Sequence, residues 1–240
     1  MKGGMYHFRQ SLGIALKTRW VAPYLLIPPM LAIIVRLGIL VPPSLQSLEL
    51  LPWGNTSLAL WHASFLVALI SGIESCLFLS GIWESRWMLN SLALPVKRAS
   101  AFWGPFLAVL TVSTSVYALT VGAVLAALPG MRVFPLTLLL LETYVPVLWA
   151  VSVGAFLGML TSRTGAVVLM IAWFVAGSVP LERISHVPVW VTRLLPPLGS
   201  LVSSGINLPE SLLLASILLV HALLALVGGR ILFELSLSRN

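Results

Sequence analysis

Long apolar stretches alternate with short polar ones along most of the 240-residue chain. A membrane-spanning helix needs about 20 predominantly apolar residues. Stretches close to or above this length predict spans at about 21–41, 58–82, 101–128, 135–160, 165–180 and 210–234. The pattern therefore predicts an all-α integral membrane protein with six transmembrane helices. We expect a kink in the first span, because Pro28 and Pro29 cannot donate interior helical hydrogen bonds.

Two regions outside these spans also carry helical signals. Residues 1–20 place most of their apolar side chains on one side of a helix, which predicts an amphipathic helix along the cytoplasmic interface. The alternative is a frayed basic N-terminus that only helps to fix the topology. Residues 181–209 are semi-apolar and broken by prolines, which predicts short re-entrant or external helices before the last span. No repeat or linker divides the chain, so we expect a single transmembrane domain over residues 1–240.

The composition excludes a soluble globular protein. Hydrophobic residues make up 59% of the chain and charged residues only 9%, whereas soluble domains carry about 25% charged residues. Such a chain could not cover its surface with polar groups, so we expect the lipid bilayer to surround it. The net charge of +7 could indicate nucleic-acid binding, but the basic residues are scattered singly, so no nucleic-acid partner is expected. The single Cys76 makes no intrachain disulfide.

The distribution of basic residues predicts the orientation, because Lys and Arg favour the cytoplasmic side of a membrane. With the N-terminus inside, ten of the 14 basic residues fall on the cytoplasmic side. The remaining four, on the outer side, are Arg36, Arg132, Arg183 and Arg193. We therefore expect an N-in, C-in, multi-pass protein of the cytoplasmic (cell) membrane.

Catalytic and metal-binding motifs are missing from the sequence. It contains no G-x-x-x-x-G-K-[ST] phosphate-binding loop, no H-E-x-x-H, no G-x-S-x-G and no cluster of Cys and His. The four histidines are far apart in the chain, at His7, His62, His186 and His221. We therefore expect no enzyme activity, and neither a metal nor another cofactor in this chain.

The segment between the second and third predicted spans reads WESRWMLNSLALPVKRASAF and interrupts the apolar pattern. It predicts a short helix over 84–95. Glu84 suits the positive N-terminal end of such a helix, and Pro95 stops it. Trp87 and Leu94 fall on an apolar stripe along it. The segment is either a docking helix or an ordinary cytoplasmic loop that sets the topology.

This layout resembles the membrane (permease) subunit of type 2 ATP-binding-cassette (ABC) exporters. The resemblance covers essentially the whole chain and is mostly architectural. Its most specific part is the polar segment, in which an acid leaves the second span and a short helix leads to Leu-Pro and basic residues. Trp87 and Met88 stand where many members have a Gly-Thr pair. The resemblance implies that 84–95 is a coupling helix for a separate ATPase. The implied ATPase-coupling residues are Glu84, Arg86, Trp87, Leu94, Pro95 and Lys97.

The resemblance also implies how such a chain works. It would pair with a second copy of itself or with a related permease, and with two copies of an ABC ATPase subunit. ATP and Mg²⁺ would bind to the ATPase and not to this chain. ATP-driven movement of the coupling helix would alternate access to a path across the membrane and export a substrate, which the sequence does not identify.

Polar residues within the predicted spans are costly in a membrane and are therefore candidates for a translocation path. The alternative is structural, since hydroxyls in spans often bond to their own helix backbone and a lone acid or histidine can bridge helices. Gly154 and Gly158 form a G-x-x-x-G pair that permits close helix packing. The candidate path residues are Glu74, Thr111, Ser113, Ser115, Glu142 and His221.

Two other functions fit part of the pattern. A haem- or metal-related six-span export component would share the layout, but it would need pairs of Met or His at ligand spacing, which the sequence lacks. A non-transporting membrane scaffold or sensor that recruits a soluble partner would share the spans. An ATPase that co-purifies with the chain would distinguish the transporter from the scaffold.

Overall fold

The computed structural model describes residues 2–17, 26–30, 33, 54–83, 98–127, 133–179, 195–203 and 208–238, and regular structure in these ranges is entirely helical. This confirms the all-α prediction for the described residues. The helices are α1 (Lys2–Lys17), α4 (Gly54–Trp83), α6 (Arg98–Ala127), α7 (Val133–Leu160), α8 (Arg163–Ser178), α10 (Leu198–Ser203) and α11 (Leu208–Ser238). Residues 26–30, which include the two prolines of the first predicted span, are also helical.

Four of the described helices are long and apolar enough to cross a membrane. The segments are Leu60–Ile82, Ala99–Ala126, Leu139–Leu160 and Glu210–Ser236. They confirm the second, third, fourth and sixth predicted spans as helices, to within a few residues at each end. At the fifth predicted span, α8 is apolar but only 16 residues long, which is shorter than the about 20 residues that a crossing needs. Most of the first predicted span lies outside the described residues.

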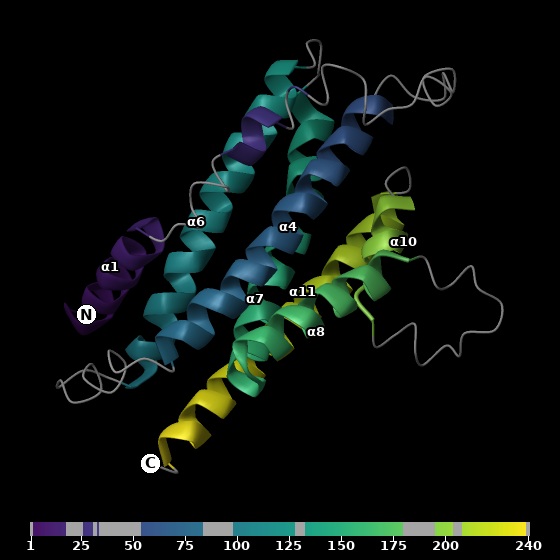
Figure 1. The fold of residues 1–240 in the computed structure, drawn as a ribbon. Helices are drawn as coiled ribbons and strands as arrows, with labels where there is room; N and C mark the ends of the chain where they lie inside the picture. The colour runs from purple at the N-terminus through teal and green to yellow at the C-terminus, as the bar shows by residue number, and fades with distance from the viewer. Residues whose placement is uncertain are drawn as a thin grey trace.

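α4, α7 and α11 run in one direction along the bundle, and α6 and α8 run in the opposite direction (Figure 1). α4, α7 and α11 end where α6 and α8 begin. We call this the basal end of the bundle. Because α4 ends at Trp83 and α6 begins at Arg98, residues 84–97 join two helix ends that both lie at the basal end.

Glycines let α4 and α7 approach each other closely. A Cβ at Gly154 of α7 would lie 2.5 Å from the carbonyl oxygen of Gly72 in α4, and Gly158, one turn further along, meets α4 in the same way. The hydroxyl of Ser75 donates a hydrogen bond to the carbonyl of Val151 at 2.8 Å. Small residues commonly make such contacts between membrane helices. The predicted G-x-x-x-G pair is therefore confirmed as a packing contact.

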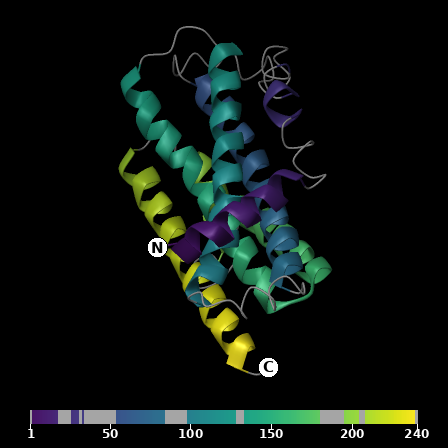
Figure 2. The ribbon, with the colours of Figure 1, turned by 90° about the vertical axis from the view of Figure 1, so that its left-hand side faces the viewer.

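α1 lies across the outside of α6, at an angle to the long helices (Figure 2). The contact includes Gly104, where a Cβ would lie 2.7 Å from the Cβ of His7. His7 and Ser11, one helical turn apart, are buried, whereas Met5 and Leu16 are exposed. The predicted helix is present, and it turns the polar His7 and Ser11 toward α6 and the apolar Met5 and Leu16 outward, where lipid suits them.

The remaining helices complete the bundle. α8 packs on α4 and α7, and α10 packs on α8 and α11. α10 confirms a short helix within the predicted 181–209 region, most of which lies outside the described residues. α11 packs mainly on α7, and only 28% of its apolar segment is buried, compared with 72% for α7.

Candidate functional site

The predicted ATPase-coupling residues lie outside the described residues, between two helices that the structure describes. α4 leads into this segment and α6 leads out of it, both at the basal end. The residues concerned are Glu84, Arg86, Trp87, Leu94, Pro95 and Lys97. Their coupling role stays a prediction.

All four long helices contribute to one hydrophobic cluster at the basal end. Ile82 of α4, Phe102 of α6 and Phe233 of α11 are buried in it, and Met159 of α7 packs against them. The ring centroid of Phe102 lies 5.8 Å from that of Phe233 and 5.2 Å from that of Trp103. We call this set the basal cluster. It comprises Phe78, Ile82, Ala101, Phe102, Trp103, Met159 and Phe233.

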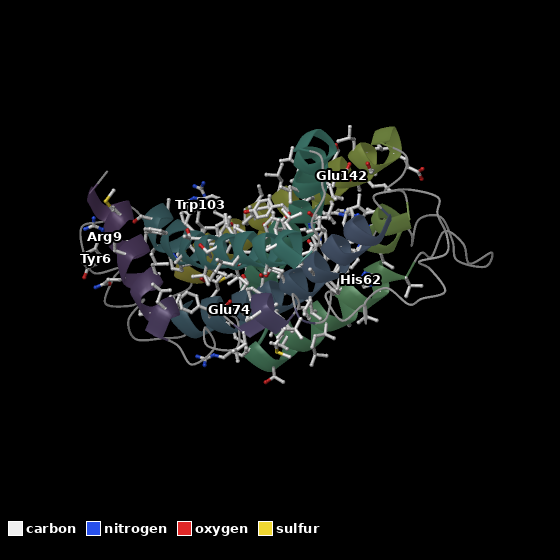
Figure 3. The ribbon with its side chains drawn as sticks, turned by 90° about the horizontal axis from the view of Figure 1, so that it is seen from above. Tyr6, Arg9, His62, Glu74, Trp103 and Glu142 are labelled. Carbon is white, nitrogen blue, oxygen red and sulfur yellow. The ribbon has the colours of Figure 1, made fainter. Side chains whose placement is uncertain are left out.

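The two acids predicted for a path are buried in separate parts of the bundle (Figure 3). Glu142 of α7 is 6% exposed and accepts a hydrogen bond of 2.6 Å from the hydroxyl of Ser211 in α11. Glu74 of α4 is 7% exposed. Ser64 of α4 bonds to Thr143, the neighbour of Glu142, and lies ten residues from Glu74, about 15 Å along a helix axis. The structure therefore does not bring the two acids together.

The hydroxyl residues predicted on α6 divide between two faces. Thr111 and Ser115 are exposed, and their hydroxyls donate to backbone carbonyls four residues earlier, at 2.7 Å and 2.9 Å. Ser113 is fully buried. His221, on α11, is partly buried. A path shared by these residues and the two acids stays a prediction.

Hydroxyl groups at the level of Glu142 form a hydrogen-bond network that the sequence pattern did not predict. The hydroxyls of Tyr117 and Thr143 lie 2.7 Å apart and join α6 to α7. Ser64 of α4 donates to the carbonyl of Thr143, and the hydroxyls of Thr114 and Tyr144 pair at 2.7 Å. The only signal of this network in the sequence was the presence of Tyr and Thr residues inside predicted spans. The network joins α4, α6 and α7 in the half of the bundle away from the basal cluster.

Comparison with protein families and with curated proteins does not explain these features. No protein-family model matches it, and a search of curated proteins finds no match. Among the described residues, no three His, Cys, Asp or Glu side chains lie close enough together to hold a metal ion. The residues that the structure describes form a helical protein with four helices that could cross a membrane.

Proposed function

We propose that the chain is the membrane-spanning permease subunit of an ABC exporter of type 2. It works in the cytoplasmic membrane with two copies of a separate ATPase and with a second copy of itself or a related permease. ATP and Mg²⁺ bind to the ATPase, so this chain supplies no catalytic residue and no cofactor. It moves its substrate outward by alternating access.

The observation that carries this proposal is the position of the helix ends beside residues 84–97. Ile82, two residues before the segment, and Phe102, five residues after it, both belong to the basal cluster, to which every long helix contributes. A segment anchored on both sides in this way can pass a displacement to the spans, because packed interiors resist compression. A loop that only sets topology needs no such anchorage.

Basic residues support a cytoplasmic position for the basal end. Arg98 and Arg163 begin helices there, and Arg230 lies near the end of α11. Arg9 belongs to α1, which crosses α6 close to the beginning of that helix. Because Lys and Arg favour the cytoplasmic side, this orientation gives a soluble ATPase access to residues 84–97.

Charge reversal within the segment tests the proposal. The tagged chain would be purified in mild detergent from its native membranes, and the retained ATPase subunit and its ATP turnover would be measured. Arg86→Glu should lower both several-fold without preventing membrane insertion, because it reverses a charge within the segment proposed to dock on the ATPase. Arg9→Glu, which alters an exposed arginine of α1 elsewhere near the basal end, is the matched control and should retain the ATPase. Equal retention in the two variants would argue against the coupling role.

A further inference from the structure

The basal cluster links both ends of residues 84–97 to a third helix, α11. The ring of Phe102 has no exposed surface, and it contacts the side chain of Phe233 in α11. A Cβ at Gly229 would lie 3.7 Å from Cζ of Phe102, so the ring also lies close to the backbone of α11. Phe102 is therefore a point at which the beginning of α6 touches the last turns of α11.

Other aromatic rings hold Phe102 from the side of α6. Phe106 lies parallel to it, with ring planes 5° apart and centroids 6.5 Å apart, and Trp103 meets it edge-on. An enclosed ring has no free volume to move into, because protein interiors are close-packed. A displacement of the beginning of α6 must therefore displace Phe233 as well.

Of the four long helices, α11 has the smallest share of its apolar segment buried against the rest of the described bundle. Only 28% of its apolar segment is buried, against 56% for α4, 50% for α6 and 72% for α7. α4 and α7 are locked to each other by the backbone approach at Gly154. α11 meets α7 less closely: a Cβ at Gly228 would lie 3.1 Å from the ring of Phe156, and one at Gly229 would lie 3.4 Å from its Cα. A displacement that reaches the basal cluster should therefore move α11 before it separates α4 from α7.

We propose that Phe102 is the positioning residue that passes movement of residues 84–97 to α11 through Phe233. The inference rests on the proposed function, because ATP binding to the partner ATPase supplies the movement. Phe102 sets the position of the basal end of α11 relative to α6. Its aromatic ring is required to fill the space between the two helices.

Fluorescence of the chain in complex with its captured ATPase tests this. Single cysteines at Leu107 of α6 or Ile231 of α11, both exposed positions, would carry an environment-sensitive fluorophore in a Cys76→Ala background. In the chain that carries no substitution in the basal cluster, ATP with vanadate should change the emission of the fluorophore at both positions. Phe102→Ala should keep the response at Leu107 and abolish it at Ile231. Phe102→Leu, which restores apolar bulk, should recover part of the response at Ile231.

Two further variants separate this role from general packing. Phe233→Ala should reproduce the effect of Phe102→Ala, since it removes the other half of the contact. Phe65→Ala, which removes an aromatic ring of α4 that contacts Phe174 and lies outside the basal cluster, should keep both responses.

Three results would overturn the inference. An undiminished response at Ile231 in Phe102→Ala would show that α11 moves without the ring. Loss at both positions would show that the ring is needed earlier, for engagement of the ATPase. If no ATPase is captured by the unsubstituted chain, or neither probe responds in it, the proposed function fails and this inference fails with it.

Discussion

Ser211 is the hydrogen-bond donor that the structure provides for the buried carboxyl group of Glu142. An acidic residue in an apolar span could be recognised from the sequence, because such residues are rare in membranes. Its partner could not, since Ser211 lies 69 residues further along the chain, and helix pairing decides the contact. The bond joins α7 to α11 and therefore favours the structural role for Glu142.

Ser211→Ala should destabilise the protein, because a buried acceptor loses its donor. Such a loss costs about 1–3 kcal/mol and should lower the midpoint of thermal unfolding in detergent. Ser216→Ala is the matched control, since Ser216 is on the same helix but is exposed and bonds to its own backbone. Equal midpoints for the two variants would contradict the role assigned to the bond.

His7 makes the docking of α1 sensitive to pH. Burial against α6 lowers the pKa of its imidazole below the ordinary value of 6.5. A lowered pKa means that the docked helix binds a proton less readily than the undocked helix. Docking is therefore strongest above about pH 6.5 and weakens as the pH falls through the range between the ordinary and the lowered pKa.

Cysteine labelling in the Cys76→Ala background would measure this effect. A cysteine at the buried Ser11 should react slowly with a thiosulfonate reagent at pH 7.5, relative to one at the exposed Ile14. At pH 5 the labelling rate at position 11, relative to the rate at position 14, should rise several-fold, because protonated His7 leaves the contact. His7→Phe should remove the pH dependence. A ratio that is the same at both pH values would contradict the prediction.

At the scale of helices, the contact between α4 and α7 depends on the absence of a side chain at Gly154. Gly154→Leu should force the two helices apart, because its Cβ alone would meet the backbone of Gly72. Overpacking of this kind costs about 1–3 kcal/mol or more. Gly122→Leu is the control, since nothing lies within 4 Å of a Cβ there. If thermal unfolding shifted equally in both variants, the glycine contact would not be the cause.

The hydropathy pattern predicted where the helices lie along the chain better than it predicted which helices contact each other. α4, α6, α7 and α11 match predicted spans because apolar length alone identifies a membrane helix. The fifth predicted span, residues 165–180, corresponds to the equally short α8, which begins at Arg163 after the cap at Ser162. That this short helix crosses the membrane stays a prediction. The docking of α1 on α6 could not be foreseen, since Gly104 resembles any other glycine in a span. The same holds for the pairing of Tyr117 with Thr143, which depends on how two helices face each other.

For the whole molecule, the account predicts that the basal end faces the cytoplasm. In the Cys76→Ala background, cysteines at Asn90 and Thr164 should be labelled from the cytoplasmic side by an impermeant reagent. Thr164 is exposed at the beginning of α8, at the basal end. A cysteine at Arg132, which follows α6 at its opposite end, should be labelled from outside. The reverse pattern would overturn the orientation, and a split between Asn90 and Thr164 would contradict a common basal end.

The central claim is that an ATPase on a separate chain drives this protein through residues 84–97. The most direct measurement is the protein composition and ATP turnover of the complex obtained when the tagged chain is purified gently from its native membranes. The account predicts one nucleotide-hydrolysing subunit for each permease subunit in the complex, and release of that subunit by Arg86→Glu. Purification of the chain without any ATPase, while it still carries out its complete activity in liposomes, would contradict the account.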